Sequence, residues 1–146
     1  MTATALDDWL LDPVVAPTVD GDPLAPLYEA ATRHELALPF CTECAQPLEF
    51  DQEVCDRCSG SERDWRTVDL QGVVHAATLM HRREPGLVHA PSPYPIVDVE
   101  LTSGHRMVMT TVHPADTAPP IGASVHIGFR HLGGVLIPAI DSLEDE

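Results

Sequence analysis

The chain has 146 residues, of which 44% are hydrophobic, so it can form one ordinary domain or a small domain with a satellite. It carries 23 acidic residues against 8 basic ones, all of them arginine, and its formal net charge is −15. This balance disfavours nucleic-acid binding, because basic side chains are needed to displace the counterions of a phosphate backbone. No stretch approaches the roughly 18 uninterrupted apolar residues of a membrane span. The acidic first residues do not resemble a signal peptide, so we expect a cytoplasmic protein.

The negative charge is concentrated in the first half of the chain. Residues 1–69 hold 15 acidic residues and 4 arginines, whereas residues 70–140 hold 4 of each. Solubility alone explains such an excess, and a basic protein partner is the alternative. The last six residues, DSLEDE (141–146), are predicted to form a separate acidic tail.

Residues 1–38 are predicted to be an N-terminal segment, extended at first and then helical. Its first 24 residues are rich in aspartate and proline, with a candidate anchor from Trp9 to Leu11. Alternatively, the apolar residues from Trp9 to Val15 wait for the surface of a partner. The run PLYEAATRHELAL (26–38) has apolar residues at helical spacing and a proline in its first turn, so it is the predicted helix.

All four cysteines lie in the segment 39–66, which we predict to be a zinc ribbon. They form two C-x-x-C pairs, Cys41/Cys44 and Cys55/Cys58. Each pair offers two thiolates from one tight turn, and two such turns can surround a zinc ion tetrahedrally. Four thiolates leave no coordination position for water or substrate, so the predicted role is structural and not catalytic. A redox pair of the thioredoxin type, or iron, is the alternative, but a redox pair would need a βα unit that the sequence does not show.

Residues 67–140 show the alternation that is typical of β-strands. Gly72 indicates a bulge or a sharply coiled strand, and turns are predicted at 102–104 and 133–134. Five short, strongly bent strands fit a small closed barrel better than a flat sheet, so the fold is predicted to be mainly β. The five runs are VDLQGVVHAATLMHR, PIVDVEL, HRMVMTTVH, SVHIGFRH and VLIPAI.

The alternation also assigns side chains to the two faces of these strands. In the second run, Val97, Val99 and Leu101 are expected to face inward, and Asp98 and Glu100 to face solvent. In the fourth run, the residues expected to face inward are Val125, Ile127 and Phe129, and those expected to face outward are His126 and Arg130.

No catalytic set is evident outside the cysteines. Seven of the eight histidines fall between His75 and His131 without metal-site spacing, and we expect them to be structural or at the surface, with a pH-sensitive interface as the alternative. The adjacent pair Arg82 and Arg83 lies in the longest irregular segment (81–95). Two arginines could clamp a phosphate, such as the nucleotide end of coenzyme A, or could belong to a solvated loop.

A short helix, a four-cysteine ribbon and a five-stranded barrel in this order resemble the DUF35 group, in which a rubredoxin-like zinc ribbon is joined to an OB-fold. The ribbon part of the resemblance rests on CTEC, CDRC and the following Trp65, and the barrel part on GVVHAAT, PYPIVDVEL, SGHRMVM and IGASVHIGF. Two positions depart from the family pattern, since Ala45 stands where glycine is usual and Asp56 where proline is usual.

The resemblance implies an acyl-CoA-associated accessory subunit without catalytic residues of its own. Such a subunit binds and stabilises a thiolase-fold enzyme, which is a thiolase, an acyltransferase or an aldolase of steroid side-chain breakdown, and helps to form its acyl-CoA entrance. The first alternative is an autonomous acyl-CoA-binding protein that uses Arg82 and Arg83. A remote alternative is the nucleic-acid binding that other OB-folds perform, which needs basic grooves and stacking aromatic side chains.

Overall fold

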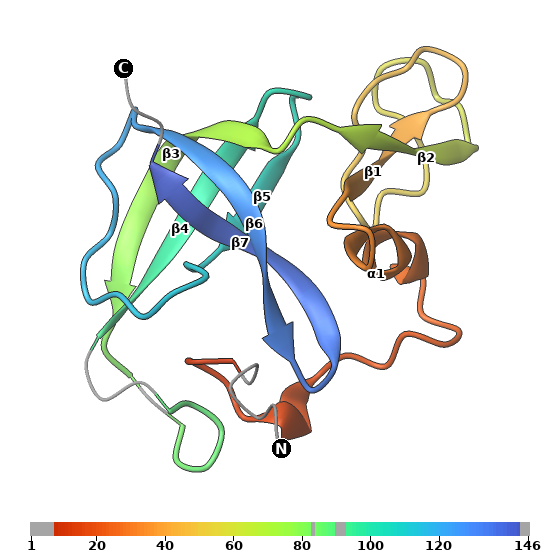
Figure 1. Ribbon diagram of the computed structural model, residues 1–146. Coiled ribbons are helices and arrows are strands. Elements are labelled where there is room, and N and C mark those ends of the chain that lie inside the picture. The colour runs from red at the N-terminus through yellow and green to blue at the C-terminus, as the bar shows by residue number, and fades with distance from the viewer. Residues whose placement is uncertain (1–7, 83, 90–92, 144–146) are drawn as a thin grey trace.

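The computed structural model describes residues 8–82, 84–89 and 93–143. It is mainly β, with one short α-helix, a two-stranded ribbon and a five-stranded sheet (Figure 1). Among these residues no helix is long and apolar enough to cross a membrane. We call residues 36–68 the ribbon and residues 71–143 the barrel. The α-helix and strands are α1 (Ala25–Ala31), β1 (Leu36–Cys41), β2 (Arg63–Val68), β3 (Gln71–Met80), β4 (Tyr94–Leu101), β5 (Arg106–Met109), β6 (Ser124–Leu132) and β7 (Val135–Leu143).

The helix is shorter than the sequence predicts. It ends at Ala31, and the chain then turns through His34, whose φ of 57° lies in the left-handed region. The predicted continuation to residue 38 is wrong, because β1 begins at Leu36 and pairs with β2 in antiparallel register. Five of the six residues of β1 are buried, so its apolar run reflects burial on both faces and not a helical stripe.

The barrel has the five predicted strands in the order β5-β4-β3-β6-β7. It closes where the chain after β5 meets β7, since Ile140 N donates to Thr110 O at 2.9 Å and Val112 N donates to Ile140 O at 2.8 Å. The bridge between Thr111 and Ile140 is parallel. Because β6 does not pair with β5 but returns to pair with β3, the five strands form a partly open Greek-key barrel of the OB-fold type. The predicted inward positions Val97, Val99, Leu101, Val125 and Ile127 are buried.

The irregularity expected at Gly72 has a different form. The β-bulge between β3 and β4 lies between Val74 and Ala76. Gly72 pairs with β4 on one side and β6 on the other, and a Cβ on it would lie 2.6 Å from Val99 Cγ1. A glycine is therefore needed there because two strands approach closely, which fits a coiled central strand.

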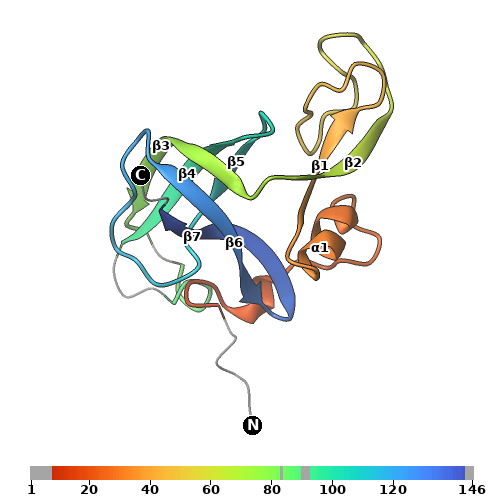
Figure 2. The same ribbon diagram turned by 45° about the horizontal axis from the view of Figure 1, so that its top comes forward.

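The ribbon and the barrel share one hydrophobic core. Leu36 and Leu38 of β1 are fully buried, and Leu27 of α1 is 5% exposed. All three belong to the same cluster as the barrel residues Val97 and Ile140. The two parts, which lie side by side in Figures 1 and 2, are therefore packed together at the base of the ribbon.

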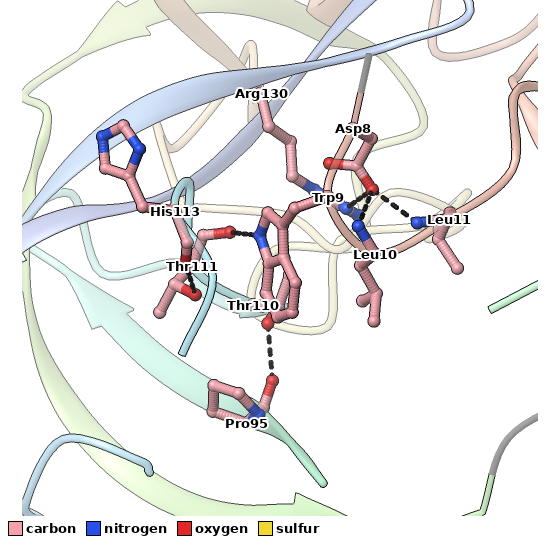
Figure 3. A network of polar contacts seen from close by, with 9 residues as sticks. All are labelled: Asp8, Trp9, Leu10, Leu11, Pro95, Thr110, Thr111, His113 and Arg130. Atoms are coloured by element: carbon pink, nitrogen blue, oxygen red, sulfur yellow. Dashed lines mark hydrogen bonds and ion pairs between the residues drawn. The ribbon is translucent and has the colours of Figure 1, made fainter. Parts of the chain in front are cut away.

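The N-terminal anchor is confirmed, and it binds the barrel of its own chain. Trp9 Nε1 donates to Thr111 O at 2.8 Å (Figure 3), and Leu10 is buried against Tyr94. Leu11 forms an antiparallel bridge with Val88 in the loop after β3. The alternative, that the apolar residues from Trp9 to Val15 bind the surface of a partner, is therefore wrong for residues 9–11.

Arg130 is covered by this segment, although the alternation in β6 predicts that it faces outward. Its guanidinium lies 2.6 Å from the Asp8 carboxylate, with side-chain exposures of 11% for Arg130 and 0% for Asp8. The same carboxylate oxygen accepts hydrogen bonds from the backbone N–H groups of Leu10 and Leu11 at 3.1 and 2.8 Å (Figure 3). A residue that faces out of the barrel is thus buried by a part of the chain that sequence periodicity does not include.

Candidate metal centre

The four cysteine sulfur atoms lie within 4.8 Å of one another at one end of the ribbon. The Sγ atoms of Cys41 and Cys58 are 3.6 Å apart, and so are those of Cys44 and Cys55. Sulfurs about 2.3 Å from a tetrahedral zinc ion are about 3.8 Å from each other, whereas a disulfide needs about 2 Å. The arrangement therefore fits a metal ion held by four thiolates.

The two C-x-x-C turns have the same backbone hydrogen bonds. The N–H group four residues after the first cysteine donates to its C=O, and the N–H of that cysteine donates to the C=O five residues after it. The bonds are Ala45 N to Cys41 O (2.9 Å), Ser59 N to Cys55 O (2.9 Å), Cys41 N to Gln46 O (2.9 Å) and Cys55 N to Gly60 O (2.8 Å). Ala45 and Ser59 have φ values of 64° and 66°. The turn therefore requires a left-handed residue after each second cysteine, which explains why glycine would suit Ala45.

The thiols of this cluster need a cation between them. Backbone N–H groups of Cys44 and Glu43 lower the pKa of the Cys41 thiol to about 7. The N–H of Gly60 also lowers the pKa of Cys58, but the neighbouring thiols of Cys41 and Cys44 outweigh it and bring that pKa to about 12. Four thiols this close cannot all ionise without a compensating charge, and a divalent metal ion supplies it.

The surroundings of the sulfur atoms leave little space. A Cβ on Gly60 would lie 3.3 Å from the sulfurs of both Cys41 and Cys58. Cys41 and Cys55 are buried, whereas Cys58 is exposed. A metal held by all four thiolates has no open coordination position, so this centre suits a structural ion.

A buried histidine joins the barrel to the strand that carries the first cysteine. His105, in the turn between β4 and β5, is 6% exposed. Its Nε2–H donates to Pro39 O at 2.9 Å, and its Nδ1 accepts from the Ser103 hydroxyl at 2.7 Å. Burial lowers the pKa of His105, so the neutral ring is favoured. The sequence offers no signal that separates this histidine from the other seven.

Of the two predicted coenzyme A contacts, the structure describes Arg82 alone. Arg82 is exposed, and its guanidinium lies 3.0 Å from the carboxylate of Glu84. Arg83 lies outside the described residues. The assignment of this pair to coenzyme A stays a prediction.

The acidic residues of β4 lie on the outer face of the barrel, as the alternation predicts. The side chain of Asp98 is bound by Arg106, whose guanidinium lies 2.8 Å from it, and this hydrogen bond lowers the pKa of Asp98. Glu100 is exposed. Both carboxylates thus belong to a solvated strand face.

Two comparisons with known proteins bear on these features. Residues 65–130 match the family model of the ChsH2 C-terminal OB-fold domain. A chain of the solved structure "Ltp2-ChsH2(DUF35) aldolase" superposes on this chain with a TM-score of 0.69 at 25% sequence identity. The match covers 87% of this chain and 98% of that chain.

These matches support the interpretation of this chain as a DUF35 protein with an OB-fold. No curated protein matches its sequence. The structural match is wider than residues 65–130 and must include part of the ribbon as well as the barrel. The resemblance to DUF35 proteins that the two C-x-x-C pairs and the strand order indicate is therefore confirmed.

Proposed function

We propose that this DUF35 protein is a non-catalytic accessory subunit that binds and stabilises a thiolase-fold enzyme acting on acyl-CoA. The observation that carries the proposal is the similarity to a chain of the Ltp2-ChsH2(DUF35) aldolase, which extends over 98% of that chain. A match over almost the whole length favours the same kind of assembly, a hetero-oligomer with an enzyme partner. The absence of a recognisable nucleophile set from the sequence supports a role outside the chemical step.

In this proposal the ribbon holds a structural Zn²⁺ ion through Cys41, Cys44, Cys55 and Cys58. The ion supplies no step of a reaction, and it keeps the two C-x-x-C turns together. Because Leu36 and Leu38 anchor the ribbon in the barrel core, an ordered ribbon has a fixed direction relative to the barrel. A partner would therefore meet one rigid surface.

In this proposal the partner catalyses the reaction, which is aldol cleavage of a steroid side chain or a thiolase or acyltransferase step. This subunit helps to form the entrance for acyl-CoA. Coenzyme A is anionic, and a chain with a net charge of −15 repels it at most of its surface. We therefore assign the cationic contacts with the phosphates mainly to the partner.

The test is co-expression of the full chain with any thiolase-fold enzyme that is encoded beside it, followed by size exclusion and native mass spectrometry. We expect one hetero-oligomer that contains zinc and that cleaves or transfers acyl-CoA faster than the enzyme alone. Separate elution beside an active enzyme contradicts the accessory role.

Titration of coenzyme A against the isolated chain tests the autonomous alternative. We expect no binding of physiological strength, and no difference between the natural chain and the double variant Arg82→Ala/Arg83→Ala. Saturable binding that this variant abolishes would favour the autonomous alternative.

A further inference from the structure

The outer edge of β2 has backbone groups without a partner strand. β1 and β2 pair in antiparallel register, and Thr42 N donates to Glu62 O at 3.2 Å directly beyond the last strand pair. Hydrogen-bonded and non-hydrogen-bonded pairs alternate in such a ladder. The residues of β2 that bond to β1 are therefore Asp64, Arg66 and Val68, and those whose N–H and C=O groups face away are Arg63, Trp65 and Thr67.

The opposite edge of the ribbon is already occupied. The outward groups of β1 bond to the loop between the knuckles, since Cys41 N donates to Gln46 O at 2.9 Å and Leu48 N donates to Pro39 O at 3.1 Å. On the β2 side, no described residue forms a backbone hydrogen bond with Arg63, Trp65 or Thr67. Figure 2 shows β2 along the outer rim of the ribbon. β2 is thus the one open edge of the ribbon sheet in the described chain.

This edge has no feature that sterically blocks the addition of a strand. Exposed edges in natural proteins are protected by proline, bulges or charged side chains, especially lysine. The six residues of β2 include no proline, bulge or lysine, and their charged side chains are those of Arg63, Asp64 and Arg66. The edge is also held rigidly. The Trp65 ring stacks at 6.5 Å on Phe50, and the Arg63 guanidinium lies 5.9 Å from the Trp65 ring and 2.8 Å from Phe50 O.

The charge around this edge indicates which kind of partner it can bind. Exposed cations in this part of the chain are Arg57 and Arg66, and Arg66 is paired with Asp64 at 3.3 Å. A second copy of a chain with a net charge of −15 would be repelled, whereas a segment rich in arginine or lysine would be attracted. The exposed carboxylates of residues 43–69 are Glu43, Glu49, Asp51, Glu53, Asp56, Glu62, Asp64 and Asp69.

We propose that the outer edge of β2 binds an extended basic segment of a partner protein, which adds to the ribbon as a further strand. The inference rests on the proposed function in taking that segment to belong to the enzyme partner. Outward N–H and C=O groups of Arg63, Trp65 and Thr67 supply the main-chain hydrogen bonds, and the surrounding carboxylates supply the preference for basic side chains.

The test uses the full, zinc-loaded chain labelled with ¹⁵N and, as probe, a short capped peptide of alternating arginine and valine. A fully N-methylated peptide of the same sequence is the control, because it keeps the charge and loses every N–H donor. We expect the first peptide to shift the β2 amide signals and to slow hydrogen exchange at Arg63, Trp65 and Thr67. The N-methylated peptide should do neither.

Two variants of Thr67 refine the test. Thr67→Pro removes one outward N–H group and leaves the bonds to β1 in place, since proline is tolerated on an edge strand. We expect it to weaken peptide binding about tenfold, the order of one lost hydrogen bond and a steric block. Thr67→Val keeps the N–H group and should bind within about twofold of the natural chain. Zinc content and melting temperature check that both variants are folded.

The proposal is overturned if the unmodified peptide gives no shifts at millimolar concentration, or if binding survives both N-methylation and Thr67→Pro. Its failure is separable from that of the accessory role. A complex with a thiolase-fold enzyme that forms equally well with Thr67→Pro would keep the proposed function and reject the strand edge. Peptide binding without any enzyme complex would keep the strand edge as a binding site and reject the proposed function.

Discussion

The barrel is held together by aliphatic side chains, whereas the ribbon has few apolar side chains of its own to bury. The barrel core includes fully buried residues such as Val97, Val99 and Ile127. At the far end of the ribbon, the buried cluster consists of Leu48, Cys41 and Cys55, with Cys44 packed against them. A region this poor in apolar area is stable when a metal or a cross-link replaces a core. The comparison shows that one chain has two sources of stability, a hydrophobic core in the barrel and a metal centre in the ribbon. The two regions contact each other at Leu36 and Leu38.

Metal removal is the change that should separate the two regions most strongly. Structural zinc contributes about 10–16 kcal/mol of apparent binding energy in small zinc domains, and the ribbon has no other comparable source of stability. Strong chelation, or Cys44→Ser, should abolish hydrogen-exchange protection in residues 41–62 while β3–β7 stay partly protected. Retained protection of the ribbon without metal would contradict a structural zinc site.

Leu38→Ala tests the place where the regions meet. Leu38 belongs to β1 but is fully buried among barrel residues. Its truncation should lower the free energy of unfolding by about 2–5 kcal/mol, measured by urea denaturation with a barrel signal. The control is Val54→Ala in the ribbon loop, where Val54 is 54% exposed, and it should change stability by less than about 0.5 kcal/mol. Equal effects of the two substitutions would show that the base of the ribbon is not part of the barrel core.

Asp8→Ala tests whether the barrel also depends on the N-terminal segment. The substitution leaves the guanidinium of Arg130 buried without its anion, and removal of one partner of a buried pair costs about 3–5 kcal/mol. The expected result is a lower urea midpoint and faster exchange of the Leu10 and Leu11 amides. The double variant Asp8→Leu/Arg130→Met removes both charges and should recover much of the loss. No recovery would show that the hydrogen bonds to Leu10 and Leu11 dominate.

The smallest expected effect is a pH dependence of stability that is caused by His105, where the barrel contacts the ribbon. Burial lowers the pKa of His105 below its unfolded value of 6.5, so the unfolded state binds more protons between those two pKa values. The free energy of unfolding therefore rises with pH between the two pKa values, and the stabilisation is absent at lower pH. The melting temperature should fall between pH 7.5 and 5.5 by less in His105→Asn than in the natural chain. His81→Asn, at an exposed position, is the control and should behave as the natural chain does.

Sequence reasoning was accurate where structure is local. The C-x-x-C spacing brings each pair of sulfurs together through one turn, and strict alternation identifies the inward residues of β4. It failed where distant segments decide the outcome. Arg130 is buried by Asp8, 122 residues earlier, and His105 is placed by Pro39, 66 residues earlier. The predicted helix is too long because the buried run after His34 has apolar residues on both faces, and periodicity alone does not distinguish such a run from a helix.

The shared core also has a consequence for the order of events during folding. Leu36 and Leu38 are synthesised well before Ile140, which belongs to the same cluster and lies about 100 residues later in the sequence. Contacts between such distant residues form late, because closing a long loop costs entropy before the contact stabilises it. The cysteine turns need only the residues between 41 and 60, so they can capture a metal ion while the last strand is still being made. The metal would then stabilise a preformed ribbon, and Leu36 and Leu38 would become buried only when the barrel closes.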